Sequence, residues 1–351
     1  FVQRLPMRAE RLILAAILIT AAPNDLQSQA GLAELRVRVR AGPGVAAGGA
    51  LLALIDASDR VVAEGLSSEN GSRMLAAPAG TYRVRVRRIG FQPFFSGPVV
   101  IPRSGELAIL VESPRVVLSS VLVTAKSRCR KIDGDTQILS VLWSEITKAL
   151  RASQLTMDDV AAVGSAWTYR QEVDDDGRVV ANDTTIIQLK NKKPFGAPSP
   201  SRLAQDGYVS GDQFKGWEYS APDEAVLLSQ EFQATHCFRA QRSAKRPAQI
   251  ALAFEPLPGR EISDIAGSIW VDEATSELRD ITFQYANAGL LSKFEAGGAT
   301  RFRRMKSGAW LVDRWHLRAP RLIQRVGHPI VATGYYENGG GFSDDPVAAG
   351  K

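Results

Sequence analysis

The stretch GTYRVRVRRIGFQPF, Gly80 to Phe94, decides how the first hundred residues fold. Apolar and charged residues alternate along its first half, which is the period of an extended strand with two unlike faces. One face carries Tyr82, Val84 and Val86, and the other carries Arg83, Arg85 and Arg87. Gly90 then permits a bend, and Pro93 ends strand pairing. The pattern predicts a strand at the surface of a sheet, with its apolar face in a core.

The same alternation occurs in LRVRVR, Leu35 to Arg40, and further short strand-like runs follow one another up to Val123. Turn-forming residues separate these runs at intervals of roughly ten residues. The turns are Pro43-Gly44, Gly48-Gly49, Asn70-Gly71 and Pro78-Ala79-Gly80. No helical periodicity interrupts the series. Residues 32–123 are therefore expected to form a small antiparallel β-sandwich.

The arginine faces of the two alternating strands have two explanations. The residues concerned are Arg36, Arg38, Arg40, Arg83, Arg85 and Arg87. If the two strands are neighbours, six guanidiniums crowd one face, which is unfavourable unless acids or an anionic partner lie nearby. The alternative is a solvated outer face, where the arginine stems cover apolar surface. We expect the solvated face, and contact with an anionic surface stays a hypothesis.

Residues AGTYRVRVRRIGFQP, Ala79 to Pro93, resemble the end of a carboxypeptidase regulatory-like domain. In that family a Gly-Thr-Tyr turn leads into a strand that ends near a Gly-aromatic-x-Pro corner. The resemblance covers residues 32–112. It implies a transthyretin/Ig-like β-sandwich that is not itself catalytic and accompanies exported proteins. The segment that follows, Val116 to Cys129, resembles the extension that joins such a domain to TonB-dependent receptors.

The first thirty residues have the layout of a secretory signal peptide. Arg8 and Arg11 directly precede the apolar run Leu12 to Ala22, and Ser28-Gln29-Ala30 offers a cleavage site. An uncleaved anchor is the alternative, but this run is too short to cross about 30 Å of hydrocarbon. We expect export to the periplasm or to the outer-membrane or cell surface of a bacterium. The formal net charge of +6 is mild, so nucleic acid is not an expected partner.

The chain has two cysteines, Cys129 and Cys237. In an oxidising compartment an even pair is typical of a disulfide, and closing so long a loop contributes about 4–5 kcal/mol in chain entropy. Two separate buried thiols are the alternative. A metal site is not expected, because two cysteines and the adjacent His236 fall short of four ligands.

Residues 126–347 are expected to form an α+β domain with a large antiparallel sheet. Apolar residues at helical spacing predict a helix over Ile138 to Ser153, and a second helix is expected over Pro222 to Gln233. Most other segments alternate as strands, with hairpin turns near Asp272-Glu273 and at Ser307-Gly308.

Four segments of this half resemble a two-part family of exported bacterial proteins. They are THCF (Thr235 to Phe238), AFEP (Ala253 to Pro256), GSIWVD (Gly267 to Asp272) and GAWLVDRW (Gly308 to Trp315). The succession of strands is also similar in architecture to the curved sheets of periplasmic lipoprotein carriers. That likeness implies a sheet with one concave face, which holds either an acyl chain or a core.

No catalytic motif stands out in the sequence. It contains no G-x-S-x-G, H-E-x-x-H, P-loop or C-x-x-C pattern. His236 adjoins Cys237, but an exported cysteine with a partner available is expected to be structural. The run Asp174-Asp175-Asp176-Gly177 lacks the alternating acids of a calcium loop and is expected to be a tight turn. We therefore expect neither enzyme activity nor a cofactor.

Two functions follow from these observations. The first is a non-catalytic binding or assembly module at the bacterial envelope, with an envelope protein, a polysaccharide or a lipid surface as its partner. The second is a periplasmic carrier of a hydrophobic ligand, in which Trp270, Phe283 and Trp310 face an open concavity. Aromatic residues in strands are more often core or rim residues, so only an unfilled apolar cavity favours the carrier.

Overall fold

The computed structural model describes residues 31–111, 136–163, 165–190, 193–212, 216–289, 292, 294, 296–323 and 331–342. Every helix and strand given below belongs to one compact unit within Leu32–Lys351. The fold is mainly β, as the sequence predicts, with 53% of the described residues in strands and 15% in helices. Across the described ranges, no helix is long and apolar enough to cross a bilayer.

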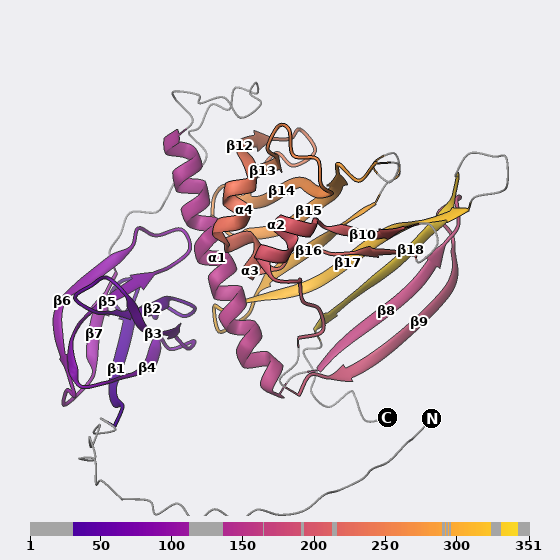
Figure 1. Cartoon of the computed structure of the whole chain (residues 1–351). Helices are drawn as coiled ribbons and strands as arrows, with labels where there is room; N and C mark the ends of the chain where they lie inside the picture. Colours follow the sequence, from indigo (N-terminus) through magenta and orange to yellow (C-terminus); the bar gives the residue numbers. More distant parts are fainter. Residues whose placement is uncertain are drawn as a thin grey trace, which may run out of the picture. The chain divides into compact units, whose positions relative to one another are not determined.

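The first part of this unit is a sandwich of two sheets (Figure 1). One sheet has the order β4-β1-β7 and the other has the order β3-β2-β5-β6. Their apolar faces enclose a core in which Leu35, Val37 and Val84 are fully buried. The strands are β1 (Ala33–Arg40), β2 (Leu51–Ile55), β3 (Val61–Leu66), β4 (Ser72–Ala77), β5 (Gly80–Arg87), β6 (Phe94–Ile101) and β7 (Leu107–Leu110).

The alternating stretch at the start of the sequence forms β5 and the loop after it. Tyr82, Val84 and Val86 are buried in the sandwich core, which confirms the predicted apolar face. However, β5 belongs to one sheet and β1 to the other. The two strands meet through their apolar faces across the core, so their arginines lie on opposite outer faces. The crowding of six guanidiniums on one face, considered from the sequence, is therefore wrong.

The second part is a sheet of nine described strands in the antiparallel order β12-β13-β14-β15-β16-β17-β18-β8-β9. Its strands are β8 (Ser165–Val173), β9 (Val179–Gln188), β12 (His236–Arg242), β13 (Gln249–Pro256), β14 (Asp264–Asp272), β15 (Leu278–Ala286), β16 (Gly297–Arg304), β17 (Trp310–Ile323) and β18 (Val331–Phe342). A separate hairpin consists of β10 (Val209–Asp212) and β11 (Gly216–Tyr219). The helices are α1 (Thr136–Val163), α2 (Pro200–Asp206), α3 (Glu224–Leu228) and α4 (Gln230–Thr235).

The helices differ from the prediction in their extent. α1 does not end at Ser153 but continues to Val163. The Ser153 hydroxyl is buried within it and donates to Glu224 Oε1 at 2.7 Å. The expected second helix is divided at Ser229, whose hydroxyl accepts from the Phe232 N–H and caps α4. α2 was not predicted, although a proline in the first turn, here Pro200, favours a helix start.

A large hydrophobic core lies between the helices and one face of the sheet (Figure 1). We call this face the core face. Helix α1 contributes Leu142 and Ile146 to it, and the sheet contributes residues such as Ile269. Leu51 and Leu66 of the sandwich belong to the same core. The sheet β3-β2-β5-β6 therefore packs its outer side against the second part of the unit.

A buried ion pair on α1 holds the loop that follows β5. The side chains of Glu145 and Lys148 are 2% and 3% exposed, and Oε1 lies 2.5 Å from Nζ. Glu145 Oε2 accepts from the Gly90 N–H at 2.8 Å, and Lys148 Nζ donates to the carbonyl oxygens of Arg88 and Phe91 at 3.1 and 2.8 Å. Burial lowers the pKa of Lys148. A buried pair of this kind is tolerated only when its remaining hydrogen-bonding capacity is met.

We expect Lys148→Met to destabilise the protein by about 3–5 kcal/mol, because it leaves the Glu145 carboxylate buried without a partner. Denaturant unfolding of the full chain measures this loss. Lys193→Met is the matched control, since Lys193 forms an exposed ion pair with Asp158 on the same helix and exposed pairs contribute about 0–1 kcal/mol. Equal losses in the two variants would contradict a special role for the buried pair.

Candidate ligand-binding cavity

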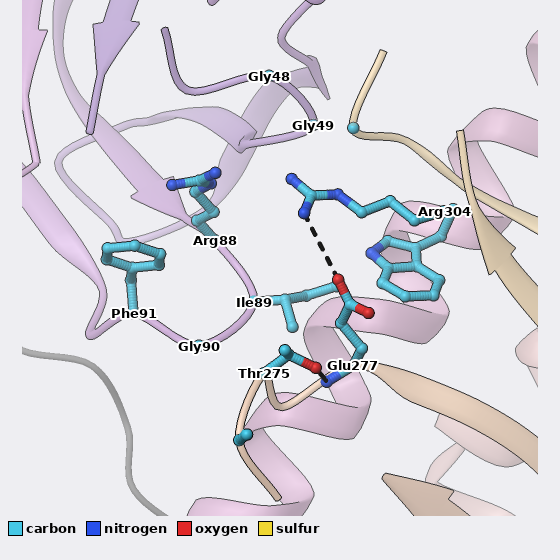
Figure 2. A pocket seen from close by; sticks show the side chains of 12 residues that line it. Gly48, Gly49, Arg88, Ile89, Gly90, Phe91, Thr275, Glu277 and Arg304 are labelled. Atoms are coloured by element: carbon cyan, nitrogen blue, oxygen red, sulfur yellow. Dashed lines mark hydrogen bonds and ion pairs between the residues drawn. The ribbon is translucent and has the colours of Figure 1, made fainter. Parts of the chain in front are cut away.

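A small hollow lies where the sandwich meets the sheet (Figure 2). It has a volume of about 160 Å³ and is lined by the loop 88–91, by Gly48-Gly49 and by the hairpin ends that carry Glu277 and Arg304. Arg304 and Glu277 form an ion pair at 3.5 Å within it. Pockets for small molecules usually have about 300–1,000 Å³. We interpret this hollow as a consequence of the junction rather than as a binding site.

Contact between glycine backbones closes the junction beside this hollow. A Cβ atom on Gly49 (φ 70°) would lie 2.0 Å from the carbonyl oxygen of Gly308. A Cβ atom on Gly308 (φ 87°) would lie 2.5 Å from the carbonyl oxygen of Gly48. The sequence predicts both turns correctly, but nothing in it indicates that they meet. Their contact requires residues without side chains.

We expect Gly49→Ala to cost at least about 2 kcal/mol more than Gly44→Ala, because only the first forces two backbones apart. Gly44 is the matched control: its φ of 72° is equally unfavourable for alanine, but a Cβ there meets nothing within 4 Å. Denaturant midpoints of the two variants compare the costs. If both variants lose the same stability, the close contact between the two turns does not contribute.

The arginines of β5 are not the solvated row expected from the sequence. All three are partly buried, and Nε of both Arg85 and Arg87 is buried without a hydrogen-bond partner among the described residues. Burial, and after it the charge of Arg85, lowers the pKa of Arg87 to about 10. Leu51, the neighbour of Arg87 on β2, belongs to the core beneath α1. The sequence shows only that this face is charged, not that another part of the chain covers it.

On β1 the expectation of a solvated face is met. Arg36 and Arg40 are exposed, and Arg38 Nε pairs with Glu106 Oε1 at 2.7 Å. The two rows of arginines therefore differ in exposure: the row on β1 is largely in solvent, and the row on β5 is partly buried. Contact of these arginines with an anionic surface stays a prediction.

A second hollow, of about 540 Å³, lies beside β4. Arg36, Arg73 and Met74 of the sandwich line it together with Thr156 of α1 and Met305 of the second part. Most of its lining residues are serine, threonine or arginine, and none is aromatic. It is a weaker candidate for a small-molecule site, because it lacks the aromatic side chains that commonly line such sites.

The third space, which we name the aromatic cavity, has about 410 Å³ and lies on the core face of the sheet. The sheet supplies Phe283, Thr300 and Trp315, β11 supplies Tyr219, and the segment 194–198 supplies Phe195. The Phe195 and Trp315 rings lie 5.2 Å apart between centroids. Four aromatic side chains therefore surround a space that no side chain fills.

Hydrogen bonds fix the wall of the cavity opposite the sheet. Asp223 Oδ1 accepts from the Val226 N–H at 2.9 Å and caps α3, while its Oδ2 accepts from the Ala197 N–H at 3.2 Å. One carboxylate thus joins the helix start to the segment that carries Phe195. On the other side, Tyr285 donates to the carbonyl oxygen of Ser220 at 3.0 Å and anchors the chain after β11.

The cavity also has polar groups at its wall. Ser220, Thr300 and Asn338 line it together with the aromatic rings, and so do the ionisable residues Glu218 and His316. These groups suit a ligand that combines an apolar body with a polar end.

The three aromatic residues chosen from the sequence do not come together. Phe283 lines the aromatic cavity, but Trp310 lies at the small junction hollow. Trp270 is buried away from the main core, under the guanidinium of Arg246 at 4.6 Å. The hypothesis that they share one concavity is wrong. The regular register of β14 and β15 pairs Phe283 with Gly267, so the alternation along β14 puts Trp270 on the opposite face of the sheet.

Sequence reasoning missed Phe195, Tyr219 and Trp315 as one group. Phe195 lies between prolines in an irregular segment, and Tyr219 ends a short hairpin, so neither has a periodic pattern. Trp315 is one of six tryptophans, and its alternation along β17 gives its face but not the residues opposite. Only the folded chain brings them together.

The described contacts of His236, next to Cys237, hold the fold together and do not form a catalytic pair. His236 is 5% exposed, and its Nδ1 lies 3.0 Å from the carbonyl oxygen of Phe232. Its Nε2 lies 3.1 Å from Asp264 Oδ1. Both ring nitrogens are thus engaged. Within the described ranges, no three histidine, cysteine, aspartate or glutamate residues are grouped so that they could hold a metal ion.

The cysteine pairing stays a prediction. Cys237 lies in β12, and Cys129 lies outside the described residues. We expect thiol labelling of the denatured, unreduced protein to find no free thiol, and labelling after reduction to find two. Two reactive thiols before reduction would contradict the disulfide.

Comparisons with known proteins provide no family for this chain. No protein-family model and no curated protein matches it. Among solved structures, a 9R-lipoxygenase from Cyanothece PCC8801 matches 73% of this chain with 11% identity and a TM-score of 0.17. The match covers 40% of the lipoxygenase chain. A likeness this weak supports no conclusion about fold or activity.

Proposed function

We propose that this chain is a non-catalytic binding protein whose second part takes up a ligand with an apolar body in the aromatic cavity. The observation that carries the proposal is the unfilled space of about 410 Å³ among four aromatic side chains. Its size and its mixture of aromatic and few polar residues are typical of small-molecule sites. This favours a carrier of a hydrophobic ligand over a module that acts only through its surface.

The lining indicates the class of ligand. Trp315 and Phe283 offer flat apolar surface on the sheet side, and Phe195 covers it from the segment opposite. Asn338 and Thr300 offer hydrogen bonds to a polar end. Neither arginine nor lysine lines the cavity, whereas Glu218 and His316 do. We therefore propose a ligand without negative charge that has an aromatic or acyl body.

We further propose that the protein works at the bacterial envelope. The signal-peptide pattern in residues 1–30 and the resemblance of residues 32–112 to carboxypeptidase regulatory-like domains support this location. The sandwich then serves as an accessory domain. Its attachment to α1 through Glu145 and Lys148 supports a role in holding the second part in place.

Binding of N-phenyl-1-naphthylamine, an uncharged fluorescent probe with two aromatic groups, tests the cavity directly. We expect the full chain to bind it, and Trp315→Ala to lower the affinity at least tenfold. Thr300→Phe should lower it as well, by filling the space from the sheet without removing core. The probe's fluorescence measures both titrations.

Trp167→Ala is the matched control. Trp167 pairs with Gly341 on β18, whereas Trp315 pairs with Gly340. Because Gly340 and Gly341 are consecutive, the two tryptophans lie on opposite faces of the sheet. The affinity of Trp167→Ala for the probe should stay within twofold of that of the unaltered chain. If Trp315→Ala and Thr300→Phe both bind the probe as tightly as the unaltered chain, the aromatic cavity is not the site.

A further inference from the structure

The face of the sheet opposite the core face carries a second cluster, which we name the arginine–aromatic face. It consists of Arg301 on β16, Arg314 on β17, and Trp167 and Tyr169 on β8. Register places Arg301, Arg314, Gly341 and Trp167 in one row across four adjacent strands. These strands lie side by side in the sheet (Figure 1). Both arginines are exposed and both rings are partly exposed.

The two arginines face each other directly across β16 and β17. Arg301 and Arg314 are direct neighbours in the ladder, an arrangement that destabilises a sheet when the charges are alike. Neither forms an ion pair in the described part of the chain. The acid on the other side of Arg301, Asp280, is bound by Arg246 at 2.7 Å. A β-bulge follows directly after Arg301, and bulges often re-aim side chains next to functional sites.

Two aromatic rings lie beside these arginines over glycines of β18. The Trp167 and Tyr169 centroids are 6.0 Å apart, with 18° between the ring planes. A Cβ on Gly341 would lie 3.0 Å from the Trp167 ring, and one on Gly339 would lie 2.5 Å from the Tyr169 ring. The glycines thus give the rings room to lie across the neighbouring strand. The Arg314 guanidinium lies 6.0 Å from the Trp167 ring centroid.

A buried carboxylate holds this aromatic pair in place. Glu337 Oε1 accepts from the Tyr169 hydroxyl at 2.8 Å and from Gln171 Nε2 at 2.9 Å, and its Oε2 accepts from Arg318 Nε at 2.9 Å. Although burial acts in the opposite direction, the hydrogen bonds from Tyr169 and Arg318 keep the pKa of Glu337 below its usual value. The carboxylate is therefore already neutralised, and it does not compensate Arg301 or Arg314.

We propose that the arginine–aromatic face binds an acidic polysaccharide. The exposed parts of the two nearly parallel rings suit the apolar face of a pyranose unit, and guanidiniums bind carboxylate or sulfate groups through two parallel hydrogen bonds. Asn182 and Thr184 continue the same face onto β9 with neutral groups that can bond sugar hydroxyls. The proposal is independent of the aromatic cavity, which lies on the opposite face.

Calorimetric titration with alginate oligosaccharides, which are polymers of uronic acids, tests this proposal at physiological salt. We expect the full chain to bind alginate and not neutral dextran. Arg301→Gln with Arg314→Gln should weaken alginate binding at least tenfold, and so should Trp167→Ala. The double variant should also melt at a higher temperature than the unaltered chain, because it removes like charges that face each other.

Two controls separate this site from general charge and from the cavity. Arg103→Gln with Arg202→Gln removes two exposed arginines elsewhere, and alginate affinity should stay within twofold. Trp315→Ala should leave alginate binding unchanged. The proposal is overturned if the unaltered chain does not bind alginate, or if the control pair weakens binding as much as the test pair. It is also overturned if single-stranded oligothymidylate binds as tightly, since the face would then recognise any polyanion.

Discussion

The buried ion pair between Glu145 and Lys148 is the constraint on which the joining of the two parts depends. A charge buried without its partner costs several kcal/mol, so α1 must keep both residues against the backbone of the loop 88–91. That loop is the continuation of β5. The same helix gives Leu142 and Ile146 to the core under the sheet. Both the sandwich and the nine-stranded sheet are therefore attached to α1.

The period of two along a strand lets one strand serve two faces. On β17, Trp315 and Leu317 line the aromatic cavity, while Arg314 and Arg318 project from the other face. On β18, Gly340 faces Trp315, while Gly339 and Gly341 lie under Tyr169 and Trp167. The three consecutive glycines remove side chains from both faces at one point. The two proposed sites are thus built back to back on the same pair of strands.

The sequence was sufficient for features that depend on local pattern. The buried face of β5 with Val84, the hairpin turn after Asp272 and the turn at Ser307-Gly308 all follow from alternation and turn-forming residues. It was insufficient where distant segments meet. The alternation along β1 and β5 does not indicate that these strands belong to different sheets. The charge of Arg87 does not indicate that another part of the chain partly buries this residue. The aromatic cavity joins residues from β11, the sheet and an irregular segment, which no local pattern connects.

Native mass spectrometry of the protein, purified after expression of the full chain, tests the central claim that the aromatic cavity holds a ligand. The account predicts a bound adduct with the mass of a small organic molecule, which N-phenyl-1-naphthylamine displaces and which Trp315→Ala loses. Trp167→Ala should retain it. A bare mass that gains no adduct when the probe is added would contradict the account, because an open cavity among four aromatic rings would then bind nothing.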